Sequence, residues 1–141
     1  MRILLDTNVL LNTFLPRSSN FWIWEALLKG ELTLCVTTDI LLEYEEIVQQ
    51  FYGNKELTEY VIDAILSMPN LVLKNKTFFW RLIPNDEDDE KFADCYVACA
   101  AFCIVTKDKH FNVLKHNAFP PFQIFNPQEF KAIFEAYKNP S

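Results

Sequence analysis

Short apolar runs alternate with longer amphipathic stretches along most of this chain. The runs at 3–5, 32–36 and 103–106 are rich in Leu, Ile, Val or Cys, and their length predicts buried strands. Between them, apolar residues recur at helical spacing, as in the stretch from 57 to 68, which Pro69 ends. Strands that alternate with helices indicate βαβ units, in which right-handed crossovers join parallel strands.

Polar caps and glycines place the ends of the first two predicted helices. Residues 18–20 precede a helix over about 21–29, which Gly30 closes. Residues 37–39 precede a longer helix, which Gly53 closes in the same way. Glycine is expected after a helix because the chain there often takes a left-handed conformation.

The last part of the chain carries the most compact helix start. Asn126 as N-cap, Pro127 at the first position and Glu129 at the third predict a capping box, with a helix to about Tyr137. The stretch 74–85 has no clear period. The other predicted elements are a strand at 71–73, a helix through 92–100, a helical turn at 111–114 and an extended piece at 120–125.

We therefore predict an α/β fold, a three-layer α/β/α sandwich with a central parallel sheet of four to five strands. At 141 residues, half of them hydrophobic, the chain is long enough for one domain, residues 1–141, with a dense core. No apolar run approaches the roughly 18 residues of a membrane span. Met1 and Arg2 lead directly into a strand without the features of a secretory signal, so we expect a cytoplasmic protein.

The charge and the cysteines narrow the chemistry. A net charge of −6 argues against non-specific binding of nucleic acid by a basic surface, but not against an enzyme that holds phosphate through metal ions. Cys95, Cys99 and Cys103 repeat every four residues, as on one helical face, while His110 and His116 stand at no zinc-ligand spacing. We interpret these cysteines, and Cys35 within a strand, as small buried hydrophobic residues.

Four acidic residues stand where a parallel sheet would bring them to one edge. Asp6 and Asp108 follow predicted strands, and Glu43 and Asp94 lie near the starts of predicted helices. Ligand sites of open α/β sheets form at the carboxyl ends of the strands. Four carboxylates there would repel one another unless a cation neutralised them, and their hard oxygen atoms suit Mg²⁺ or Mn²⁺.

Each of these residues also has a purely structural explanation. Asp6 could cap a helix, and Glu43, beside Glu45 and Glu46, could belong to a solvated helix face. The acidic residues 86–90 are what a helix start favours in any case. Asp94 fits a solvated role less well, because the later part of its helix is apolar.

The combination of these motifs resembles the PIN domain, and more narrowly the VapC-like toxin component of bacterial toxin–antitoxin pairs. The resemblance is carried by strand-Asp6-Thr7-Asn8, the acidic turn from Asp86 through Lys91-Phe92 to Asp94, and Thr106-Lys107-Asp108 after a strand. The segment 125–130 is also similar to the family's last strand and helix start. Three positions depart from the usual pattern: Phe102 stands at a turn where the family usually has Asp, Glu90 where it usually has Asn, and Lys107 where Gly is more common.

The resemblance implies a metal-dependent endoribonuclease, with RNA as substrate, a cognate antitoxin as partner and a second copy of the chain as a homodimer partner. It implies that Asp6, Glu43, Asp94 and Asp108 are the catalytic metal ligands, with Asp89 as a possible auxiliary ligand. Thr7, Asn8 and Thr106 would hold the carboxylates by hydrogen bonds. The expected RNA phosphate contacts are the cations nearest the site in sequence: Arg17, Lys107 and Lys109.

Three other functions stay open at this point. A haloacid-dehalogenase-type phosphatase needs a second Asp as general acid two residues after the first, where this chain has Asn8. A phosphoacceptor receiver domain needs an early acidic pair, which is missing, although Lys107 fits its late lysine. A PIN-fold binding module without activity is the third alternative, and measuring divalent-metal binding would separate it from an enzyme.

Overall fold

A computed structural model describes residues 1–74, 87–116 and 122–140 of the chain. Most of the stretch 74–85 and the start of the extended piece at 120–125 therefore lie outside the described residues. The described strands are β1 (Arg2–Leu5), β2 (Thr33–Thr37), β3 (Val72–Lys74), β4 (Cys103–Val105) and β5 (Ile124–Phe125). The described helices are α1 (Thr7–Leu10), α2 (Phe21–Leu28), α3 (Thr38–Tyr52), α4 (Lys55–Leu66), α5 (Glu87–Cys99), the 3-10 helix η1 (Lys109–His116) and α6 (Pro127–Lys138).

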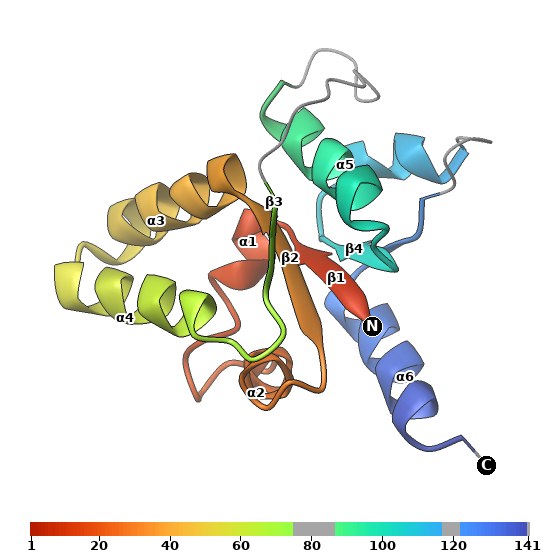
Figure 1. Cartoon of the computed structure of the whole chain (residues 1–141), viewed down its shortest axis with the longest axis horizontal. Coiled ribbons are helices and arrows are strands. Elements are labelled where there is room, and N and C mark those ends of the chain that lie inside the picture. The colour runs from red at the N-terminus through yellow and green to blue at the C-terminus, as the bar shows by residue number, and fades with distance from the viewer. Residues whose placement is uncertain (75–86, 117–121, 141) are drawn as a thin grey trace.

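The five strands form one parallel sheet in the order β3-β2-β1-β4-β5, which confirms the predicted α/β fold. Leu4 of β1 pairs with Ile104 of β4, and Val36 of β2 pairs with Leu73 of β3. In Figure 1, α3 and α4 lie on one side of the strands and α5 lies on the other. The chain reverses its direction of winding between β1 and β4, and ligand sites of such sheets form at the carboxyl ends of the strands beside that reversal.

Local capping accounts for several helix ends. The Thr37 side chain accepts a hydrogen bond from the Ile40 N–H at 3.2 Å, and α3 ends at Gly53, whose φ is +60°. Asn126 and Glu129 form the predicted capping box at the start of α6. Asn20 occupies the N-cap of α2, but its side chain makes no capping hydrogen bond there.

One element differs from the predictions. The four-residue helix α1 follows Asp6 directly and was not predicted, because one turn is too short to show a period. Cys103 lies in β4, as the strand predicted at 103–106 requires, so only Cys95 and Cys99 share the helical face of α5. All four cysteines are nevertheless free and buried, as predicted.

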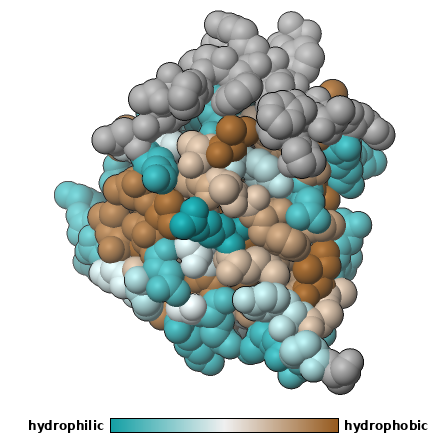
Figure 2. Space-filling view, turned by 45° about the vertical axis from the view of Figure 1, so that its right-hand side comes forward, coloured by the Kyte–Doolittle hydropathy of each residue, from teal (hydrophilic) through white to brown (hydrophobic). Residues whose placement is uncertain are grey.

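The core forms between the sheet and the helices on both of its sides. The apolar residues of the three inner strands β1, β2 and β4 are buried. Trp22 of α2 packs on Phe130 and Phe134 of α6 with ring centroids 5.7 and 5.6 Å apart. On the surface in Figure 2, hydrophobic residues form separate patches with hydrophilic residues between them. None of the described helices combines the length and apolar character needed to cross a membrane.

Candidate metal centre

Asp6 lies at the carboxyl end of the central strand, directly before α1. Its own N–H donates to the carbonyl oxygen of Val105 at 3.0 Å, which joins the ends of β1 and β4. The Asp6 side chain is buried, and its Oδ2 accepts a hydrogen bond from Thr106 Oγ1 at 2.8 Å. Burial raises the pKa of Asp6 above its usual value of 3.8, and the nearby charges of Asp108 and Glu43 raise it further. Hydrogen bonds from Thr106 and from the backbone of Thr7 oppose this rise in the pKa.

Asp108 follows β4 by three residues and is joined to Asp6 through one hydroxyl group. The N–H of Asp108 donates to Thr106 Oγ1 at 2.9 Å, and that same hydroxyl donates to Asp6. The Asp108 carboxylate is half-buried, and its Oδ1 accepts from the His110 N–H at 2.9 Å. Thr106 therefore orients two carboxylate-bearing segments at once.

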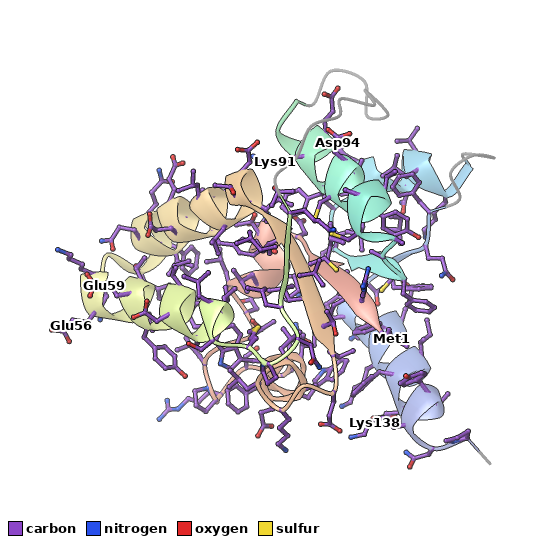
Figure 3. All side chains as sticks on the ribbon, viewed as in Figure 1. Met1, Glu56, Glu59, Lys91, Asp94 and Lys138 are labelled. Atoms are coloured by element: carbon purple, nitrogen blue, oxygen red, sulfur yellow. The ribbon has the colours of Figure 1, made fainter. Side chains whose placement is uncertain are left out.

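Glu43 reaches the same edge from the second turn of α3. Its Oε2 accepts a hydrogen bond from the Thr7 hydroxyl, and its Oε1 forms an ion pair with Lys91 Nζ at 2.6 Å. The two side chains of this ion pair are only about one-fifth exposed, and Lys91 lies near the start of α5, toward α3 (Figure 3). Lys91 was not among the predicted site residues. Its only signal in the sequence was the Lys-Phe pair of the family resemblance.

Two buried carboxylates lie one helical turn apart on α5. Asp94 is 2 % exposed and Glu90 is 4 % exposed. Within the described part of the chain, Glu90 Oε2 is buried without a hydrogen-bond partner. Glu90 was not among the predicted site residues, although its spacing of four from Asp94 puts both on one helical face. Asp89 lies in the first turn of α5, and its side chain is outside the described residues.

The structure thus brings Asp6, Glu43 and Asp108 into one electrostatic neighbourhood, while Asp94 comes from α5, which packs on β1 and α3. The donors are all carboxylate oxygens and a buried Asp6 is repelled by its neighbours, so the residues fit a hard divalent cation. Among the described residues, however, no three Asp, Glu, His or Cys side chains are already grouped to hold a metal ion.

The remaining predicted site residues lie in different settings. Asn8 is exposed, and its carbonyl oxygen accepts from the Asn12 side chain at 3.2 Å. Arg17 is also exposed, in the segment before α2. Lys107 and Lys109 line a pocket of about 240 Å³ that also contains Asp108 and Lys115. Lys115 was not predicted, because its spacing of six from Lys109 puts both on one face only in a 3-10 helix, a helix type that the sequence does not show.

Comparison with known proteins supports this description of the fold. A family model for the PIN domain matches residues 2–110. The fold is similar to a chain in the crystal structure of VapBC2 from Rickettsia felis bound to a DNA fragment from their promoter, with a TM-score of 0.60 and 19% sequence identity. That match covers 89% of this chain and 98% of the other. A search of curated protein sequences found no significant match.

Proposed function

Because the chain belongs to the PIN domain family, whose members are typically nucleases, we propose that it is a Mg²⁺- or Mn²⁺-dependent endoribonuclease. One observation carries the proposal: Asp6 is buried at the carboxyl end of the central strand, and its pKa is raised by burial and by the charges of Asp108 and Glu43. Such a concentration of negative charge is stabilised by a bound divalent cation.

We assign the metal ligands to Asp6, Glu43, Asp94 and Asp108. When bound, the ion would lower the pKa of a coordinated water and neutralise charge on the phosphate. Thr106 would hold Asp6 and Thr7 would hold Glu43, so that neither carboxylate has to be ordered when the ion arrives. Since water can serve as the nucleophile, the reaction does not require an activated Ser or Cys side chain.

Substitution of Asp6 tests this function. Asp6→Asn keeps the shape of the side chain and an oxygen that can accept from Thr106, so the fold should be retained. Cleavage of an RNA oligonucleotide in Mg²⁺ or Mn²⁺ should be lost, and calorimetry should show weaker binding of Mn²⁺. Asp63→Asn is the matched control, because Asp63 is an exposed residue of α4. Unchanged cleavage by highly purified Asp6→Asn protein would contradict the assignment.

We further propose that the protein is the toxin of a toxin–antitoxin pair. The similarity of its fold to a chain of the VapBC2 complex supports this proposal, as does a net charge of −6, which would favour association with a basic partner. An Arg or Lys of the antitoxin could enter the carboxylate cluster in place of the metal ion. Co-purification with the product of the adjacent gene tests the idea, and a complex that cleaves RNA as fast as the free protein would contradict it. The homodimer stays a prediction.

The alternative of a binding module without activity makes a different prediction. Such a protein would have no need to concentrate negative charge around a buried Asp, and calorimetry should then show no binding of Mn²⁺. Binding of Mn²⁺ that depends on Asp6 would favour the enzyme.

A further inference from the structure

Two neighbouring pockets lie at the carboxyl end of β4, beside the carboxylates. Their volumes are about 320 and about 240 Å³, and they share Lys107 and Asn126 in their walls. The second pocket also includes Thr106 and Asp108, so it adjoins the candidate metal centre directly. The first pocket continues to Pro127 and Gln128 at the start of α6. We call the two pockets together the lysine groove.

The lysine groove is basic in an otherwise acidic protein. Lys107, Lys109 and Lys115 line it and are exposed, and within the described part of the chain none of them forms an ion pair. Lys109 and Lys115 lie on one face of η1, because three residues complete one turn of a 3-10 helix. Two acids also line the groove: Asp108, one of the assigned metal ligands, and Glu129, which accepts the Asn126 N–H in the capping box at 2.9 Å. The three lysines outnumber these two carboxylates, so the groove carries a net positive charge.

A second groove has the opposite charge. It lies between α3 and α4, has a volume of about 490 Å³, and is lined by Glu45, Glu46 and Glu59. Its one lysine, Lys55, lies 4.0 Å from Glu59. A phosphate chain that leaves the metal centre would be repelled by this acidic groove and attracted by the lysine groove.

We propose that the lysine groove binds the phosphates of a single RNA strand on one side of the cleaved bond, an inference that rests on the proposed nuclease function. The strand would run from the carboxylates past Asp108, along η1, toward the start of α6. The N-terminus of this twelve-residue helix adds a partial positive charge at the far end of the groove. The three lysines would fix the strand without reading its bases.

The experiment measures binding of a fluorescein-labelled single-stranded RNA by anisotropy, in full-length protein made inactive by Asp6→Asn. The variant K107A/K109A/K115A should bind more weakly than its parent. Since each phosphate contact to a single strand contributes about 0.7 to the slope of log affinity against log salt, this variant should lose about 2 from that slope. In the active protein, the same three changes should raise KM for the RNA much more than they lower kcat.

The matched control is K29A/K55A/K131A, which removes the same charge from exposed lysines outside the lysine groove. An equal loss of RNA affinity in both triple variants would show that only net charge matters and would overturn the groove. Cleavage by the wild-type protein with an unchanged KM in K107A/K109A/K115A would also overturn it, while the nuclease function would stand. If neither the wild-type nor the Asp6→Asn protein bound RNA, both proposals would fail.

Discussion

Replacing Thr106 by Val tests whether one hydroxyl group organises the carboxylate cluster. Thr106 is buried, donates to Asp6 at 2.8 Å and accepts from the Asp108 N–H at 2.9 Å. Valine has nearly the same shape, so the change removes both hydrogen bonds and leaves the packing. A hydrogen bond to a charged group contributes about 1.5–3 kcal/mol, and a neutral one about 1 kcal/mol. We therefore expect Thr106→Val to lower the free energy of unfolding by about 2–4 kcal/mol at neutral pH.

The loss should depend on pH in a defined direction. Donation from Thr106 lowers the pKa of Asp6, so its removal should raise that pKa further above the usual value of 3.8. A carboxyl group whose pKa is higher in the folded than in the unfolded state destabilises the fold while it is ionised. This cost is present at neutral pH, and it disappears as the pH falls below 3.8. The stability difference between Thr106→Val and the wild type should therefore narrow toward acid pH.

Urea unfolding at neutral pH and at several acid pH values measures this difference. Thr106→Ser is the control, because it keeps the hydroxyl group and loses one methyl group, worth about 1 kcal/mol. The reasoning would be refuted by equal losses in the Val and Ser variants, or by a loss for Val that does not change with pH.

Two further predictions concern a buried cysteine of α5 and the ion pair of Glu43. Cys99→Ala should lower the free energy of unfolding by about 1–3 kcal/mol, as other large-to-small core changes do, and should leave the metal content of the protein unchanged. Stoichiometric zinc in the purified wild type, measured by mass spectrometry, would contradict the packing role of Cys99. Lys91→Met should lower the free energy of unfolding by about 1–2 kcal/mol, because the ion pair that it breaks with Glu43 is only partly exposed. Addition of Mg²⁺ should raise the thermal stability of this variant more than that of the wild type or of Lys91→Arg. An equal effect of Mg²⁺ on all three proteins would show that Lys91 does not substitute for the charge of a cation.

Features that depend on a few neighbouring residues could be predicted from the sequence. The capping box of Asn126 and Glu129 involves residues three positions apart, and Gly53 ends α3 through its own backbone conformation. The strand ends that bear Asp6 and Asp108 were also predictable, because short apolar runs between helices define a parallel sheet.

Features that depend on packing between distant segments could not be predicted. Glu43 and Lys91 meet because α3 and α5 contact each other, and nothing in the residues between them specifies that contact. Glu90 is similar: its burial depends on how α5 lies on the protein, while a charged residue at a helix start is usually exposed. The helix type of η1, which aligns Lys109 with Lys115, has no clear sequence signal either.

The central position of β1 in the sheet has a consequence for synthesis of the protein. β1 leaves the ribosome first, but one of its two neighbours is β4, about one hundred residues later in the chain. Until Cys103–Val105 has been made, one edge of β1 lacks its native partner, and Asp108 does not yet exist. Long-range parallel pairing is also intrinsically slow. A nascent or truncated chain that stops before Asp108 is therefore expected to lack the proposed nuclease activity, which would arise only after β4 and Asp108 have been made.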